Sequence, residues 1–303
     1  MPPTLLISDP VAAALAENRP VVALESTIFT HGLPQPRNLE VALEAEDQLR
    51  SAGVEPATIG VVDGVPVVGL STDEIVRLAA APDNLKISIR DLPVARATGR
   101  SGGTTVAATA LLAHRAGVKV FSTGGLGGVH RGASETFDES ADLVALSVTP
   151  IVVVSAGVKS ILDVGATLER LETLNITVLG YRTTTFPGFY VRDSGFEIGF
   201  RVDDPAEVAA VASARDELGL DSAVLVANPI SEELQLDPQV HAEVLAQAIA
   251  GAEAAGITGN ATTPYLLDHI QRVTGGRSLD VNVDVYRGNV GLGGEIAAAL
   301  AKG

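Results

Sequence analysis

The chain contains no cysteine and no tryptophan, and only 4% of its 303 residues are aromatic. The lack of cysteine excludes disulfide bonds, cysteine-ligated zinc and thiol nucleophiles. Because aromatic rings are scarce, the core has to be built from aliphatic side chains, which suits a parallel sheet covered by alanine-rich helices. With 46% hydrophobic residues, the composition is that of a folded protein.

Basic residues are also scarce: 21 lysines and arginines stand against 37 acidic residues, for a formal charge of −16. This balance argues against a nucleic-acid surface and against docking on an anionic membrane. A small anionic substrate remains possible where a few cations converge. No apolar run approaches the ~18 residues of a membrane span, and the N-terminus lacks the pattern of a signal peptide. We therefore expect a cytoplasmic protein.

Short apolar runs alternate with longer amphipathic stretches along the chain. This alternation predicts an α-β-α sandwich around a mostly parallel sheet. An Asp-Gly pair between two β-rich runs within 57–71 predicts a hairpin, and the chain turns helical from about residue 231. We found no linker or repeat and expect one domain over 1–303. The predicted strands are 21–25, 86–89, 118–122, 151–156, 176–181 and 223–228, and the predicted helices are 36–53, 104–117, 159–175 and 205–219.

Ligands of such sheets bind beyond the carboxyl ends of the strands, so polar residues that follow strands are the first candidates. Glu25 ends the run "VVALE". Partial burial favours the protonated form of a carboxyl group, which suits a proton donor. The structural alternative is a glutamate that caps a helix or pairs with an arginine at the rim.

Lys159 follows the buried run "IVVVSAGV". Burial favours the neutral amine, which can attack a carbonyl carbon or C1 of a sugar. The alternative is a lysine that pairs with a phosphate or a carboxylate at the start of a helix.

Two other stretches suggest a phosphate site. In "KISIRDLP", alternation places Lys86, Ser88 and Arg90 on one strand face, where two cations can hold a phosphate. In "RSGGTTVAATALLAHRAG", a Gly-Gly turn opens a helix with Thr104 or Thr105 as its N-cap. A solvated strand face and an empty helix start explain these patterns equally well.

The loop "TGGLGGVHRGASETFDESAD" combines five glycines with acids and a histidine. It does not match the dinucleotide fingerprint, which needs a further glycine and a following helix. His130, Glu135, Asp138 and Asp142 could together supply ligands to a sparse, water-rich Mg²⁺ or Mn²⁺ site. Alternatively, the segment from Asp138 to Ser140 simply caps the helix that follows. The remaining histidines receive no role.

Together these stretches resemble the pseudouridine-5′-phosphate glycosidases, also called the indigoidine synthase A-like family. The resemblance rests on motifs that occur in order along nearly the whole chain. These are "ALESTIFTHGLPQPRN", "KISIRDLP", "SGGTTVAAT", "FSTGGLGGVHRGASETFDESADL", "AGVKSILD", "ANPI" and "TPYLL". One departure is Ile89, where the family pattern suggests a basic residue.

The resemblance implies reversible cleavage of the C–C glycosidic bond of pseudouridine 5′-phosphate, to uracil and ribose 5-phosphate, in nucleotide catabolism. It implies that Lys159 forms a Schiff base with ribose C1 and that Glu25 is the proton donor. It also implies a homotrimer and one mostly water-coordinated Mn²⁺ ion at Asp138. The implied substrate contacts are Lys86, Val106, Ser140, Ala141 and Asp142, with His130 and Asn282 in the pocket.

Two other functions remain open at this stage. One is a sugar-phosphate lyase or N-glycosidase that uses Lys159 but releases another base. The other is a sugar-phosphate-binding protein without catalysis.

Overall fold

The protein is built on one large twisted sheet in the computed structural model, which describes residues 4–257 and 262–302. Within these ranges, eleven strands join in the order β1-β4-β3-β2-β7-β8-β11-β9-β10, with β5 and β6 attached at β3. The strands are β1 (Leu6–Ile7), β2 (Val21–Leu24), β3 (Glu55–Val62), β4 (Val65–Val68), β5 (Leu85–Ile87), β6 (Gly102–Thr104), β7 (Val120–Ser122), β8 (Val152–Ser155), β9 (Thr177–Tyr181), β10 (Phe200–Val202) and β11 (Val224–Ala227).

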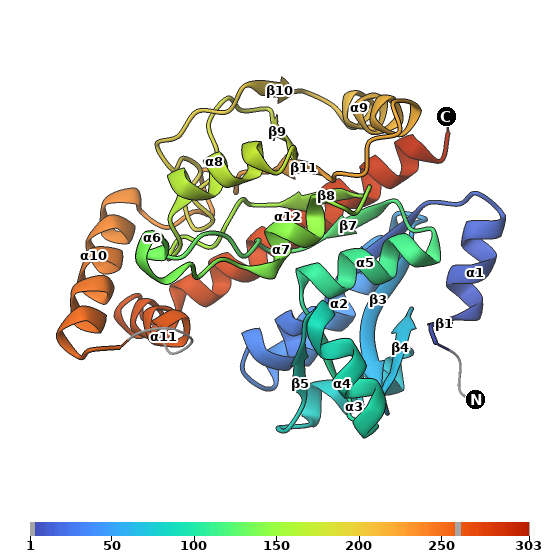
Figure 1. The fold of residues 1–303 in the computed structure, drawn as a ribbon, viewed down its shortest axis with the longest axis horizontal. Helices are drawn as coiled ribbons and strands as arrows, with labels where there is room; N and C mark the ends of the chain where they lie inside the picture. The colour runs from blue at the N-terminus through green and yellow to red at the C-terminus, as the bar shows by residue number, and fades with distance from the viewer. Residues whose placement is uncertain (1–3, 258–261, 303) are drawn as a thin grey trace.

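Helices cover both faces of this sheet (Figure 1). On one face, α2, α9 and α12 pack over the strands; α1, α5, α7 and α8 lie on the other face. The helices are α1 (Asp9–Ala16), α2 (Arg37–Ser51), α3 (Thr72–Ala80), α4 (Leu92–Thr98), α5 (Val106–Ala116), α6 (Ala133–Thr136), α7 (Ala141–Leu146), α8 (Val164–Thr173), α9 (Pro205–Glu217), α10 (Pro238–Ala254), α11 (Thr262–Val273) and α12 (Arg277–Leu300).

The central strands β2, β7, β8, β11 and β9 are parallel and buried on both faces. Side chains of β2 alternate between the two cores: Val21 and Ala23 pack into one, Val22 and Leu24 into the other. Strands that are buried on both sides appear in a sequence as continuous aliphatic runs, which is why they could be predicted. The expected α-β-α sandwich is thus confirmed. Among the helices of the described residues, none combines the length and the hydrophobicity of a membrane span.

The predicted hairpin is confirmed as β3 and β4, which pair antiparallel around Asp63 and Gly64. Both turn residues have positive φ, as this tight connection requires. The prediction for residues 86–89 was too long, because β5 ends at Ile87 and Ile89–Asp91 forms a 3₁₀ turn. The Gly-Gly turn proposed before α5 is instead strand β6, paired with β3 and β5.

The helical region predicted from about residue 231 is present as α10, α11 and α12. The 24-residue α12 has an unfavourable local sequence, because its first part alternates valine with polar residues and then carries four glycines. Two of these glycines permit close packing. A Cβ on Gly293 would lie 1.9 Å from the Ser122 hydroxyl, and one on Gly294 would lie 3.2 Å from Leu49. Tertiary packing on the sheet therefore overrides the poor helix propensity of this segment.

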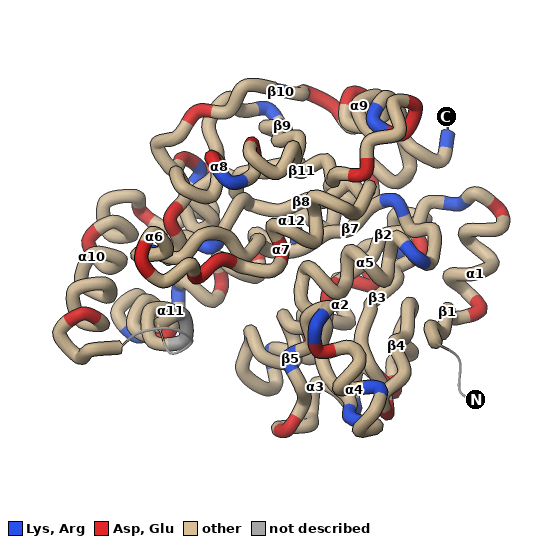
Figure 2. Tube along the Cα trace, in the orientation of Figure 1, with Lys and Arg blue, Asp and Glu red and all other residues tan. Residues whose placement is uncertain are grey.

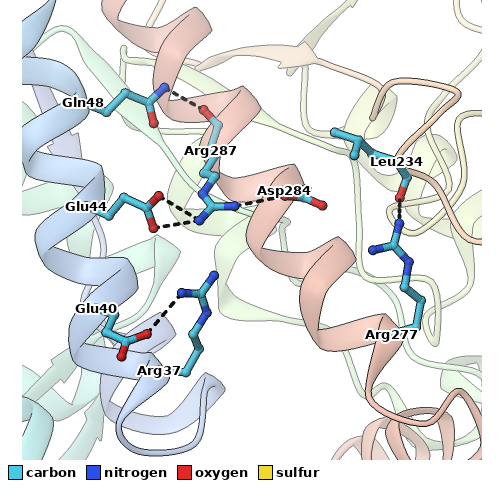
Figure 3. A network of polar contacts seen from close by, with 8 residues as sticks. All are labelled: Arg37, Glu40, Glu44, Gln48, Leu234, Arg277, Asp284 and Arg287. Carbon is cyan, nitrogen blue, oxygen red and sulfur yellow. Dashed lines mark hydrogen bonds and ion pairs between the residues drawn. The ribbon is translucent and has the colours of Figure 1, made fainter.

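Polar contacts fasten α12 to α2 (Figure 3). The Arg287 guanidinium donates to both carboxylate oxygens of Glu44, at 2.7 and 2.9 Å, and to Asp284 at 3.1 Å. Gln48 donates to the backbone carbonyl of Arg287 at 3.0 Å. These contacts hold the orientation of α12, whose inner face carries the site residues described below.

Candidate active site

Three parallel strands end side by side at the candidate site. Glu25 directly follows β2, Thr123 follows β7, and Lys159 lies in the loop after β8. The backbone N–H of Thr123 donates to Val154 at 3.0 Å, and that of Lys159 donates to Leu126 at 3.2 Å. The loops after β7 and β8 therefore continue the parallel pairing past the sheet, which brings a carboxylate and an amine to the same edge.

The Glu25 carboxylate is buried and held by two hydroxyl groups. Thr27 donates to Oε2 and Thr123 donates to Oε1. Thr123 is itself positioned by buried Asn289 on α12, whose amide donates to the Thr123 carbonyl at 2.8 Å. Asn228, after β11, donates to Asn289 Oδ1 at 2.9 Å. The acid thus has a defined orientation at the floor of the site.

Lys86, at the centre of β5, belongs to the same site. The protein around it lowers the pKa of Lys86 by desolvation, and the positive charge of Lys159 lowers it further. The negative charges of Glu25 and Asp142 act in the opposite direction. Solvent still reaches the Lys86 side chain, which is exposed. Two lysines and two carboxylates from four separate segments therefore share one electrostatic environment.

Asp142 joins two elements of the site. Its Oδ1 accepts the backbone N–H of Ala107 in the first turn of α5, and its Oδ2 accepts that of Gly127, both at 2.9 Å. The side chain is nearly buried. A carboxylate at a helix N-terminus is favoured by free N–H groups and by the helix dipole. Asp142 therefore anchors the glycine-rich loop to α5, a role that the sequence motif did not indicate.

The residues flanking Asp142 have different surroundings. Ser140 is the N-cap of α7 and accepts the Asp142 N–H at 3.2 Å, so the predicted capping is confirmed. Ala141 is exposed at the first position of α7. Val106 is buried at the first position of α5. The N-cap of that helix is Thr105, but its hydroxyl makes no capping bond.

Glycines of the loop allow its backbone to approach other elements closely. A Cβ on Gly127 would lie 2.2 Å from the Ser140 hydroxyl and 2.8 Å from Asp142 Oδ2. A Cβ on Gly125 would lie 2.6 Å from the ring of Phe189. At these two positions only glycine fits without displacement of its neighbours.

Asn282, on the first part of α12, faces the turn after β7. A Cβ on Gly124 would lie 3.5 Å from Asn282 Oδ1, which places this amide beside the turn that carries Thr123. The structure thus places Asn282 at the same edge as Glu25.

His130 and Asp138 lie together on the outer part of the loop. His130 N–H donates to the Asp138 carbonyl at 3.0 Å, and the side chains approach to 3.9 Å between Nδ1 and Oδ2. In the ranges that the structure describes, no group of three histidine or acidic side chains is arranged to hold a metal. Glu135 is exposed, and Asp142 is engaged elsewhere. The donor set therefore fits a hydrated ion on one carboxylate and does not fit a closed metal cage.

The phosphate face proposed around Lys86 is wrong in part. Because β5 ends at Ile87, Ser88 and Arg90 are not on a continuing strand face. The Arg90 side chain is 87% exposed, beside Asp91. Lys86 remains in the candidate site, where the charges of Lys159 and Glu25 act on it.

Sequence reasoning missed Thr27, Thr123, Asn228 and Asn289. Thr27, Thr123 and Asn228 lie within the motifs quoted above, but no role was assigned to them, because their relation to Glu25 arises only when four segments meet. Position was a further signal, since Thr123 and Asn228 directly follow β7 and β11 as Glu25 follows β2.

A family model described as "Indigoidine synthase A like protein" matches residues 10–299. The chain belongs to the indigoidine synthase A-like family. It is 66% identical over 296 residues to a pseudouridine-5′-phosphate glycosidase of Saccharopolyspora erythraea, covering 98% of each chain. A relative from Frankia alni with the same name is 58% identical over 98% of this chain and 82% of its own. The resemblance noted from the motifs is confirmed, and these relatives are enzymes.

Two solved structures share the fold. The prealnumycin C-glycosynthase AlnA, in complex with ribulose 5-phosphate, superposes with a TM-score of 0.93 at 41% identity, over 99% of this chain and 98% of that one. An indigoidine synthase A-like protein from Thermotoga maritima gives a TM-score of 0.87 at 35% identity, with the same coverage.

Proposed function

We propose that this protein is a pseudouridine-5′-phosphate glycosidase that uses Lys159 as a nucleophile and Glu25 as a proton donor. The observation that carries the proposal is the position of Glu25 and Lys159 after β2 and β8, two strands that flank β7 in the parallel sheet and end at the same edge. A buried acid and an amine nucleophile thereby lie at one edge of the sheet, and the charges of both act on Lys86. Relatives at 66% and 58% identity bear this activity as their name.

The bond to be cleaved joins C1 of the ribose to C5 of uracil. A carbon leaving group has no lone pair to protonate, so simple hydrolysis is slow. In the proposed reaction, the amine of Lys159 attacks C1 as the bond between C1 and the ring oxygen breaks, and that oxygen takes a proton given up by the attacking amine and becomes a hydroxyl group. The nitrogen lone pair then supplies the electrons that free C1 from the base.

Glu25 supplies the proton that uracil needs to depart. As the C1–C5 bond breaks, its electron pair stays on C5 and takes this proton, while C1 forms a double bond to the Lys159 nitrogen. Water then hydrolyses the Schiff base, which releases ribose 5-phosphate and restores the amine. The hydroxyls of Thr27 and Thr123 hold the Glu25 carboxyl in place through this cycle.

Lys86 offers a positive charge to the anionic substrate in this scheme. The remaining contacts with substrate are assigned to Val106, Ser140, Ala141, Asp142, His130 and Asn282.

We assign Asp138 as the single protein ligand of a hydrated Mn²⁺ ion, with His130 beside it. One carboxylate and several waters is a common arrangement for small hard cations that also meet a phosphate. The ion, when bound, supplies positive charge for the substrate. The homotrimer rests on the family resemblance alone, and the cytoplasmic location on the sequence pattern described above.

The deciding experiment is incubation of the purified protein with pseudouridine 5′-phosphate and Mn²⁺, with uracil measured by chromatography. Uracil release is expected. Release of uracil from uridine 5′-phosphate, without turnover of pseudouridine 5′-phosphate, would instead identify an N-glycosidase.

Borohydride trapping with ribose 5-phosphate separates the enzyme from a binding protein. A stable adduct on Lys159, located by peptide mass spectrometry, is expected. Lys159→Ala should lose both the adduct and turnover, whereas the matched variant Lys119→Ala should keep both. An intact Lys159 that binds ribose 5-phosphate and gives no adduct would favour binding without catalysis.

A further inference from the structure

A cavity of about 270 Å³ lies at the opposite end of the sheet from Glu25 and Lys159. It is lined by the first residues of β2 and β7, by the end of α1 with the turn after it, and by the last turn of α12. Since these strands start here and end at the candidate active site, the cavity is separate from that site.

Part of the cavity lining is apolar. Leu15, Val120 and Leu300 contribute hydrocarbon surface from α1, β7 and α12. A liquid water molecule takes up roughly 30 Å³, so this volume is about that of a ligand with ten non-hydrogen atoms. The cavity is therefore sized for a small molecule and not for a peptide or a dinucleotide.

The rim is basic in a strongly acidic protein. Arg19 and Lys119 line the cavity, and Lys302 follows Ala301, which also lines it. The chain has only four lysines. Two of them, Lys86 and Lys159, belong to the active site, and the other two lie at this end. Figure 2 shows the blue segments that gather where α1, the start of β7 and the C-terminal end of α12 meet.

Lys119 is the cation that is available to a ligand. Arg19 donates to Glu17 at 2.7 Å and is thus already paired. Across the ranges that the structure describes, no hydrogen bond or ion pair is recorded for the Lys119 ammonium group. The carbonyl of Ala301 at the end of α12 is satisfied by Asn18, which donates to it at 3.0 Å. Lys119 is therefore not needed as a hydrogen-bond donor to this carbonyl at the helix end.

We propose that this cavity binds a small organic anion with an aromatic or other apolar part, its charge on Lys119 and its apolar part against Leu15, Val120 and Leu300. Both a carboxylate and a phosphate monoester have this chemistry. The same elements reach the acid at their other ends, because β2 precedes Glu25, β7 precedes Thr123, and α12 carries Asn289.

The test is calorimetric titration of the full chain with phenyl phosphate and with benzoate, using benzyl alcohol as the neutral analogue. A ligand of this size is expected to bind with a dissociation constant near ~1 mM. Lys119→Met removes the charge but keeps the hydrocarbon stem, and should weaken binding by about tenfold. The matched variant Lys302→Met should bind as the wild type does, and Lys119→Met should retain its turnover.

Saturating ribose 5-phosphate tests whether the two sites are separate. Binding of the aryl anion should persist in its presence, and displacement would place the anion in the active site and overturn the proposal. Equal binding by Lys119→Met, or no binding of either anion at 20-fold above that expected constant, would overturn it as well. Ala301→Phe, which fills the cavity from the helix end, gives a second loss of binding should Lys119→Met not fold. Tighter binding of phenyl phosphate would indicate a phosphate monoester as the ligand, and tighter binding of benzoate would indicate a carboxylate.

Discussion

Burial lowers the pKa of Lys86 and the positive charge of Lys159 lowers it further, although Lys159 lies in the loop after β8 and Lys86 in β5. Two positive charges that act on each other destabilise the folded state. A folded protein tolerates such a pair where substrate binding or chemistry uses it, and sites of strongly shifted proton affinity are frequent at functional positions.

Lys86→Met is expected to stabilise the folded protein at neutral pH while it weakens substrate binding. In the folded state the pKa of Lys86 lies below its ordinary value, so the protonated amine costs the folded state free energy at pH 7. As pH rises toward the ordinary lysine value of about 10.4, the unfolded chain loses its proton too. The gain in stability of Lys86→Met over the wild type should then shrink. The free energy of unfolding in urea, measured at pH 7 and near the ordinary lysine pKa, reports this gain, with Lys302→Met as the control. A gain that is the same at both pH values would contradict the argument.

Glu25→Gln should lose turnover of pseudouridine 5′-phosphate but still give a borohydride-trapped adduct with ribose 5-phosphate. The amide keeps the size of the side chain but cannot deliver a proton to uracil C5. Ribose 5-phosphate has no base to expel, so its adduct needs Lys159 alone. Turnover and adduct are measured on the same preparation, and wild-type turnover would refute the role of Glu25.

Asp142→Asn should destabilise the fold by about 1–3 kcal/mol, because a carboxylate oxygen that accepts a buried backbone N–H is replaced by an amide nitrogen that cannot. The free energy of unfolding in urea measures the effect. Asp138→Asn, whose side chain is 38% exposed, is the control and should change this free energy by less than about 0.5 kcal/mol. Equal effects of the two variants would mean that Asp142 does not anchor the loop.

Gly127→Ala should lose both stability and activity. The added methyl group would lie 2.2 Å from the Ser140 hydroxyl, so the loop has to move away from α7 and from Asp142. Thermal unfolding and the uracil assay report the two losses. Gly199→Ala, where nothing lies within 4 Å of the added carbon, should behave as the wild type.

Asp138→Asn should raise the Mn²⁺ concentration needed for half-maximal activity by about tenfold or more, because a neutral amide is a poorer ligand for a hard cation. Titration of the metal-free protein with Mn²⁺, followed by water proton relaxation, measures binding without an activity assay. Glu135→Gln in the same loop is the control. Unchanged Mn²⁺ binding by Asp138→Asn would show that Asp138 is not a ligand of the ion.

The layers of the fold could be predicted from the chain because they depend on local pattern. Continuous aliphatic runs such as Val21–Leu24 mark strands buried on both faces, and the pair Asp63-Gly64 marks a hairpin. Glu25 and Lys159 could be nominated for the same reason, because each follows such a run directly.

Other features depend on packing between distant segments and could not be predicted. Residues Arg277–Leu300 form one helix because Gly293 and Gly294 let it approach the sheet, although glycine disfavours a helix locally. The support of Glu25 by Thr123 and Asn289 needs β2, β7 and α12 to meet, and the anchoring by Asp142 needs α5 to meet the glycine-rich loop. Burial and hydrogen-bond geometry exist only in the folded chain. The sequence alone therefore indicated the candidate catalytic residues, whereas only the tertiary structure determined which other residues hold them in place.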